Sequence, residues 1–288
     1  MSWIIYSFIY AIFNAIYITY NTKYHYNGYF LGIIRGFGIS LLTFPFIFFI
    51  DVNLSFTQLI LLILQGWLIG FYDSHIFFAS SRYGTYSTSG FMATSVIVTL
   101  ILWWIIEFKD LKLLLEDKIK FISLLFIMSG ITISYWQMMN VNITSKAEKY
   151  LYPAVFALSF MSILTRYIAL NSGSVLNGVI YYLIISCFVS GVYNVIMYYS
   201  KRLKFKKSNV NKRKINILSL IWLVVFSAVL ITAKTIALRV AYNPSYVVAL
   251  LLTSPILLDI FRHKKFRLND NGVIFLTFIF LLILFSLH

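Results

Sequence analysis

The sequence predicts an all-α membrane protein with ten transmembrane helices, arranged as two inverted repeats of five helices. Of the 288 residues, 60% are hydrophobic and 19% aromatic while only 11% are charged, a balance far from that of a water-soluble domain. The apolar residues fall into long runs, and a helix needs about 20 such residues to cross about 30 Å of hydrocarbon. The order of runs and connections in the first half of the chain also recurs in the second.

Ten apolar runs follow one another, and we expect each to form a membrane span. The connections after the third and eighth runs hold only three residues each, so they should join hairpins of adjacent antiparallel helices. The first run has no basic region before it and no cleavage site after it, so we expect it to remain as a span. The runs are 3–20, 29–50, 56–80, 84–106, 119–138, 150–170, 175–199, 215–240, 244–261 and 272–287, with SRY at 81–83 and AYN at 241–243 as the short turns.

The two hairpins align with each other at an offset of 158 residues. In both, a long span, a very short turn, a further span, a charged loop and another span follow in the same order, with the charged loops at 107–112 and 264–270. The alignment divides the chain into 1–145 and 146–288. Because each half holds an odd number of spans, the second half crosses the membrane in the opposite sense. Inverted repeats of this kind are typical of secondary transporters, which bind substrate near the midplane between the halves.

The segment FFASSRYGTYSTSGFMATSVIVTLILWWIIEFKD at 77–110 resembles the third and fourth spans of the drug/metabolite transporter superfamily, in its ten-helix EamA-like family. Glu107 matches an acidic residue of that family at the end of the fourth span. Arg35, Gly130 and the run LLTSP at 251–255 match as well, whereas Ile97 stands where Pro is common. The resemblance implies ten spans and the transport of metabolites such as amino acids, sugar phosphates or nucleotide sugars.

Basic residues dominate the charge of the chain, which is +15 in total. Most of the 24 Lys and Arg lie in the odd-numbered connections, where anionic lipid headgroups are the expected partners and nucleic acid is not. The positive-inside rule places these connections in the cytoplasm and both termini outside. The resemblance implies the reverse, so the orientation stays open at this stage.

Two ionisable side chains of the first half should face the interior of the bundle. Small residues mark the faces on which membrane helices approach each other closely. Arg35 lies beside such a face of the second span, which carries Gly32 and Gly36. Asp73 follows a GxxxG pair on the third span, Gly66 and Gly70. An ionisable residue at membrane depth is by default a sign of a buried partner, a wet cavity or a transport pathway.

Lys234 poses the same question in the second half, on a face of the eighth span that also carries small residues. Three interpretations stay open for Asp73 and Lys234. They form a structural ion pair, they bind the two ends of a zwitterionic substrate, or Asp73 is a carboxylate that couples transport to protons. The excess of basic over acidic groups within the spans favours an anionic or zwitterionic substrate.

Polar side chains also recur along the fourth span, where Thr85, Thr88, Met92, Ser95 and Thr99 share one face. Hydroxyls in such a stripe either bond to neighbouring helices and their own backbone or line a wet cavity. The sixth span carries a similar stripe that includes Ser162. With two residues of the ninth span, the candidate substrate-binding residues are Arg35, Asp73, Thr88, Met92, Ser95, Ser162, Lys234, Tyr246 and Thr253.

These features predict a secondary transporter of a small polar organic metabolite, an amino acid or another anionic or zwitterionic solute, in the cell membrane of a bacterium. The alternatives are a polytopic membrane enzyme and an assembly subunit of a membrane complex. An enzyme would need a cluster of catalytic or metal-binding groups, yet the four His residues are scattered and no HExxH or DxxD motif occurs. No cofactor is implied, and the partners we expect are the small-molecule substrate and membrane lipids.

Overall fold

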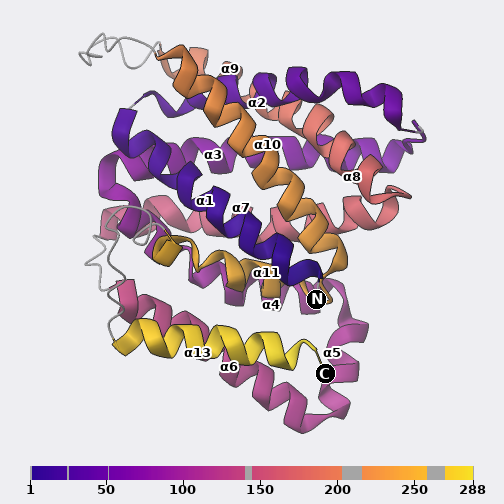
Figure 1. Cartoon of the computed structure of the whole chain (residues 1–288), viewed down its shortest axis with the longest axis vertical. Helices are drawn as coiled ribbons and strands as arrows, with labels where there is room; N and C mark the ends of the chain where they lie inside the picture. Colours follow the sequence, from indigo (N-terminus) through magenta and orange to yellow (C-terminus); the bar gives the residue numbers. More distant parts are fainter. Residues whose placement is uncertain are drawn as a thin grey trace.

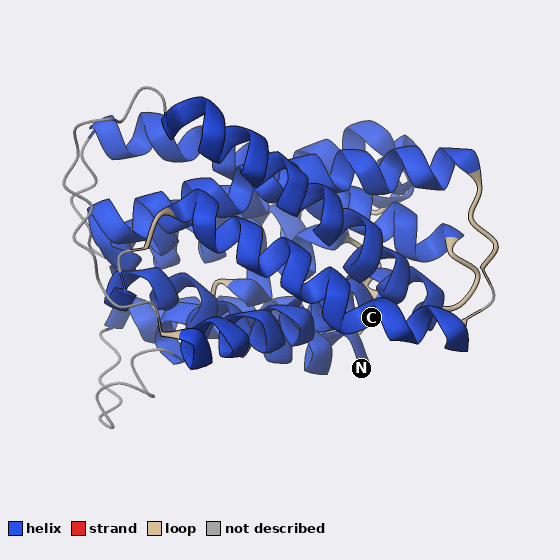
Figure 2. Cartoon of the chain, turned by 90° about the horizontal axis from the view of Figure 1, so that it is seen from above, coloured by secondary structure: helices blue, strands red, loops and turns tan. Residues whose placement is uncertain are grey.

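The described part of the chain is a bundle of helices that run in a common general direction, with their connections gathered at two ends (Figures 1 and 2). It is seen in a computed structural model, which describes residues 2–24, 26–50, 52–139, 145–202, 216–257 and 270–287 and contains no strand among them. The two chain ends lie at the same end of the bundle as α5, on the right in Figure 1.

Long apolar helices make up most of the described chain, and a few short helical segments lie between or within them. The first half forms α1 (Ser2–Tyr24), α2 (Gly28–Thr43), the 3-10 helix η1 (Phe44–Phe49), α3 (Phe56–Phe91), α4 (Thr94–Ile106), α5 (Phe108–Glu116) and α6 (Lys118–Met139). The second half forms α7 (Ser145–Asn171), α8 (Val175–Tyr181), the π-helix η2 (Tyr182–Ser186), α9 (Cys187–Arg202), α10 (Ile217–Val240), α11 (Pro244–Leu251) and α13 (Asp270–Phe285).

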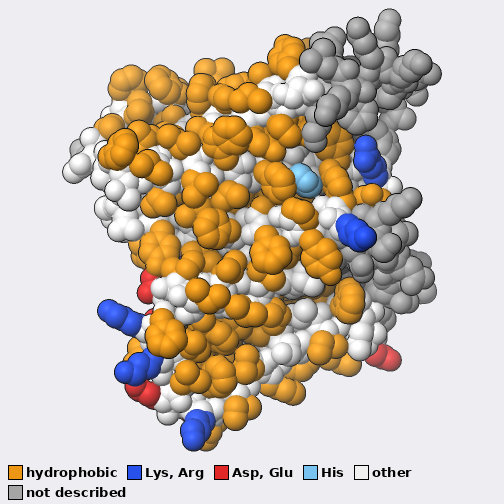
Figure 3. All heavy atoms as spheres, turned by 180° about the vertical axis from the view of Figure 1, so that it is seen from behind, with side chains coloured by type: hydrophobic (Ala, Val, Ile, Leu, Met, Phe, Trp, Pro, Cys, Tyr) orange, Lys and Arg blue, Asp and Glu red, His pale blue; other side chains and the backbone are white. Residues whose placement is uncertain are grey.

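Six helical stretches among the described residues are long and apolar enough to cross a membrane, which indicates an integral membrane protein. Four further apolar helices are shorter, at Ser2–Tyr17, Thr94–Ile106, Pro244–Leu257 and Asp270–Phe285. Large apolar side chains such as Phe48, which is 83% exposed, lie on the outer surface. Figure 3 shows these apolar side chains over most of one face, with Lys and Arg near its two lateral edges. This distribution suits a bundle whose sides face lipid and whose ends face water.

The turn predicted at 81–83 is wrong, because α3 stays helical through these residues and ends only at Phe91. The turn predicted at 241–243 is confirmed, since α10 ends at Val240 and α11 begins at Pro244. The physical difference is local. Asn243 caps α11 by accepting from the Ser245 N–H at 2.9 Å, and Pro244 suits the first turn of a helix but not its interior. Neither a Pro nor a capping bond interrupts 81–83.

The fourth and ninth predicted spans are each interrupted in the structure. The break before α4 falls at Met92 and Ala93, where the chain forms i to i−3 bonds such as Ser95 N to Met92 O at 3.0 Å. A matching break follows α11, with Thr253 N bonded to Leu250 O at 3.1 Å. The charged segment after α4, predicted as a loop, is instead largely the short helix α5. Most of its counterpart in the second half, 264–269, lies outside the described residues.

Most of the close helix packing joins the first half of the chain to the second. The helices of the first half pack against those of the second in the pairs α1 with α10, α2 with α9, α3 with α7, α4 with α11 and α6 with α13. The small-residue face of α2 accounts for one of these contacts, since a Cβ atom on Gly36 would lie 2.5 Å from the backbone nitrogen of Gly191 in α9. Replacing this glycine would force the two helices apart, so the face is a packing surface as predicted.

Two arginines tie α7 to α10 at one end of the bundle. Arg166 of α7 donates to the carbonyl oxygen of Leu238 at 2.8 Å and also to that of Ala241. Arg239 of α10 donates in return to Ala169 O at 2.5 Å and Gly173 O at 2.8 Å. Each arginine therefore satisfies carbonyl groups at the C-terminal end of the other helix, where a cation also interacts favourably with the helix dipole.

Candidate functional site

A buried ion pair lies at the centre of the bundle. Arg35 of α2 donates through Nη1 to the Oδ2 atom of Asp73 on α3, and the two side chains are 5% and 2% exposed. Tyr17 of α1 donates its hydroxyl to the other carboxylate oxygen, Oδ1, at 2.7 Å. The Arg35 guanidinium carbon also lies 5.0 Å from the centre of the Tyr17 ring, which is within range of a cation–π interaction. Both oxygens of Asp73 are thus engaged by protein groups.

The second buried cation, Lys234 of α10, lies in the same region and is 5% exposed. Its ammonium group makes no hydrogen bond or ion pair with the described residues, whereas Arg35 and Asp73, the other buried charged side chains among them, bond each other. The ion pair between Asp73 and Lys234, one of the three interpretations of the sequence, does not form. Arg35 pairs with Asp73 instead, because α2 packs directly against α3, and each carboxylate oxygen then accepts one bond.

A cavity lies among these charged groups and is called here the central cavity. Five helices of both halves contribute to its walls, together with η2. Its volume is about 30 Å³, which is room for about two water molecules. The residues that line it are Tyr10, Asn14, Tyr17, Arg35, Ile69, Tyr72, Asp73, Leu158, Met161, Tyr182, Leu230, Ile231 and Lys234.

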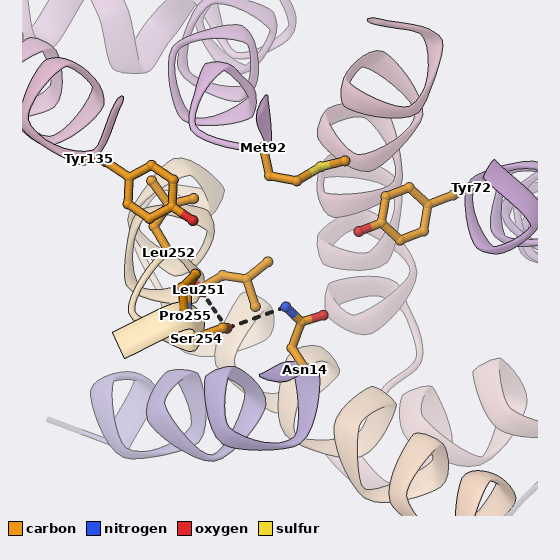
Figure 4. A pocket seen from close by; sticks show the side chains of 8 residues that line it. All are labelled: Asn14, Tyr72, Met92, Tyr135, Leu251, Leu252, Ser254 and Pro255. Carbon is orange, nitrogen blue, oxygen red and sulfur yellow. Dashed lines mark hydrogen bonds between the residues drawn. The ribbon is translucent and has the colours of Figure 1, made fainter. Parts of the chain in front are cut away.

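A second, smaller cavity lies between the two helix breaks and is called here the break cavity (Figure 4). Met92 lines it from the first break, and Leu251, Leu252 and Ser254 line it from the second. Asn14 donates to the Ser254 hydroxyl oxygen at 3.3 Å. Asn14 and Tyr72 lie in the walls of both cavities, so the two spaces adjoin.

The structure brings some of the predicted site residues together and leaves others apart. Arg35, Asp73 and Lys234 line the central cavity, and Met92 lines the break cavity. Thr253 lies within the second break between two lining residues, with its hydroxyl bonded to Leu250 O at 2.8 Å.

The remaining predicted residues are buried but line neither cavity. Ser95 bonds Met92 O at 2.5 Å and Ser162 bonds Leu158 O at 2.8 Å, so both hydroxyls are bonded within their own segments. Tyr246 packs against Trp3, with ring centres 6.1 Å apart, and Thr88 is fully buried. These side chains belong to helix packing in this structure, and the side chain of Thr85 lies outside the described residues.

Sequence reasoning missed the tyrosines that form much of the central cavity. Tyr10, Asn14 and Tyr17 stand at i, i+4 and i+7 along α1, so they share one face of that helix. This spacing, with a polar amide at its centre, is the signal that could have identified them. On α3, Tyr72 directly precedes Asp73, and from η2 Tyr182 accepts a hydrogen bond from Gln65 at 3.0 Å.

Comparison with known proteins finds no family model and no curated protein that matches this chain. The interpretation of the site therefore depends on its own geometry and chemistry.

Proposed function

We propose that the protein is a ten-span secondary transporter of a small anionic or zwitterionic metabolite, which binds in the central cavity. The observation that carries the proposal is Lys234, a cation only 5% exposed that lines a cavity and has no partner among the residues that the structure describes. An isolated buried charge is costly, and within membrane spans such groups typically mark substrate or ion pathways. A negatively charged substrate group bound in the cavity would offset the cost of burying this lysine.

The ten-span count treats the four shorter apolar helices as spans as well. All four pack within the bundle: α1 on α10, α4 on α7, α13 on α6, and α11 on α1 and α4. The proposal predicts that reporter tags fused to the two termini are reached from the same side of the membrane. Tags reached from opposite sides would contradict an even number of spans.

The pattern of helix contacts supports two repeats. Let the apolar helices be numbered one to ten along the chain, so that each helix of the first half has an equivalent five places later. The equivalent of α1 is then α7 and that of α3 is α10, and the contact of α1 with α10 corresponds to the contact of α7 with α3. The pairs α2 with α9, α4 with α11 and α6 with α13 each map onto themselves. The two helix breaks also fall at nearly equivalent positions of the halves. Interrupted helices at the interface of two repeats are typical of transporter binding sites.

The resemblance of residues 77–110 to the drug/metabolite transporter superfamily agrees with this proposal, and membership of that superfamily is part of what we propose. Alternating access would require the halves to rock about the central cavity, which in the present form holds only water-sized groups.

The direct test is flux into liposomes that contain the purified protein. Vesicles preloaded with an unlabelled carboxylate or amino acid should take up the same labelled solute by counterflow, faster than vesicles without protein. Uptake should saturate with concentration and fall strongly in the Lys234→Met variant. Folded protein that moves none of the anionic or zwitterionic solutes would contradict the proposal.

A further inference from the structure

The charges of the central cavity do not balance. Its wall holds two cationic side chains, Arg35 and Lys234, and one carboxylate, Asp73. Both oxygens of that carboxylate are occupied, one by Arg35 and one by the Tyr17 hydroxyl at 2.7 Å. The wall of the cavity therefore carries one net positive charge, and both oxygens of its carboxylate already accept a bond from the protein.

The polar atoms of the wall that have no partner are mostly hydrogen-bond donors. They include the ammonium group of Lys234, which bonds none of the described residues. The Nε atom of Arg35 is unbonded as well, but protein atoms enclose it. The hydroxyls of Tyr10 and Tyr72 also line the cavity and form no hydrogen bond with the described residues. Convergent donors around a single spare positive charge suit an anion with several acceptor oxygens, because each bond to a charged acceptor is a strong one.

The rest of the wall is apolar. Ile69, Leu158, Met161, Leu230 and Ile231 contribute aliphatic side chains, and the rings of the tyrosines add aromatic surface. This surface can bury an apolar ligand body but cannot hydrogen-bond a strongly polar one such as a sugar. Ligand sites commonly combine such walls with a few polar groups that fix orientation.

We propose that the central cavity binds a monoanion, a carboxylate attached to an apolar or aromatic body. This inference rests on the proposed function and narrows its substrate class. A zwitterionic amino acid fits less well because its ammonium group would meet an acid that is already bonded. A phosphate dianion fits less well because one spare cation neutralises only half of its charge. Since the cavity of about 30 Å³ is smaller than such a molecule, the ligand binds to a form in which the walls have moved apart.

A series of ligands that share a phenyl body and differ in charge tests the proposal. The series comprises hydrocinnamate, phenylalanine, phenethylamine, hydrocinnamyl alcohol and phenyl phosphate, each added to the detergent-purified full chain during thermal unfolding. A ligand that binds only the folded state raises the apparent melting temperature in proportion to its affinity and concentration. Hydrocinnamate should give the largest shift of the five. A larger shift with any other member, or no shift with hydrocinnamate up to about 10 mM, overturns the proposal.

Variants of Lys234 identify the group that recognises the charge. Lys234→Met should weaken hydrocinnamate binding about 10- to 100-fold, as expected for the loss of one charge-assisted contact, while Lys234→Arg should retain most of it. Lys120→Met is the matched control, since this lysine is 56% exposed in α6 and pairs only with Asp117. Unchanged affinity in Lys234→Met overturns the assignment. The ligand series on the unaltered protein stands by itself if a variant does not fold.

Flux separates this inference from the function on which it rests. Hydrocinnamate that stabilises the protein but does not cross proteoliposomes would refute transport and leave the ligand class intact. Saturable flux of phenylalanine or phenethylamine in preference to hydrocinnamate would support transport and refute the ligand class.

Discussion

Two buried cations line one cavity, and only one of them, Arg35, is paired with an acidic side chain of the described residues. Arg35 bonds Asp73, which also accepts a bond from Tyr17, whereas Lys234 lines the same cavity and bonds none of the described side chains. Both side chains are 5% exposed, so burial alone does not distinguish them. The first belongs to a hydrogen-bonded network that joins α1, α2 and α3. The second is a buried charge that no described residue pairs with, which is the condition expected of a group that meets a ligand.

The largest effect should come from removing only one partner of the Arg35–Asp73 ion pair. Asp73→Leu leaves Arg35 buried without a counter-ion, and we expect a loss of about 3 to 5 kcal/mol in the free energy of unfolding. Denaturant titration in detergent, followed by tryptophan fluorescence, measures it. The double variant Arg35→Met with Asp73→Leu removes both charges and should lose much less. Equal losses in the single and double variants would show that the pair is not a coupled unit.

The next largest loss of stability should follow a change at Gly36, where α2, the helix that carries Arg35, packs against α9. Gly36→Val places side-chain atoms where α2 meets the backbone of α9, and overpacking there should cost about 2 to 3 kcal/mol. Gly178→Ala is the comparison, because a Cβ atom there would lie 3.3 Å from its nearest neighbour, the Cα atom of Ala169, and the loss should be smaller in the same titration. A tolerant Gly36→Val would mean that α2 does not need this close approach to position Arg35.

Removing the hydroxyl group should cost more stability at Tyr17 than at Tyr72, because only the Tyr17 hydroxyl bonds a described residue. Tyr17→Phe removes a hydrogen bond to a charged acceptor and should cost about 1.5 kcal/mol. Tyr72→Phe removes a hydroxyl that bonds nothing in the described protein, so its unfolding free energy should change by less than about 0.5 kcal/mol. If the two variants lost equal stability, the distinction between occupied and spare polar groups would fail.

The sequence predicted the class of the fold and the buried charges but not how the charges pair. Hydrophobic runs located the long helices, because a segment that crosses lipid must be apolar and must satisfy its own backbone hydrogen bonds. Small residues beside Arg35, Asp73 and Lys234 correctly indicated side chains that face the interior. The partner of Asp73 could not be predicted, since it depends on which helices are neighbours, and that information is absent from a single helix pattern.

Local chemistry explains where the predicted connections succeeded and failed. The turn at 241–243 is encoded by a cap and a proline, Asn243 and Pro244. The run at 81–83 carries neither, and polarity alone did not end the helix. The cavity tyrosines escaped notice because the chain holds 21 Tyr and 27 Phe, so aromatic residues attract attention only through their spacing.

The most direct test of whether Lys234 serves a ligand and not the fold is the unfolding free energy of Lys234→Met in the absence of any ligand. We expect this variant to be more stable than the unaltered protein by about 1 kcal/mol, because methionine fills similar space without a buried, unpaired charge. The same variant should lose its stabilisation by hydrocinnamate. If Lys234→Met is instead less stable than the unaltered protein, the lysine stabilises the fold, which would contradict a role in ligand binding alone.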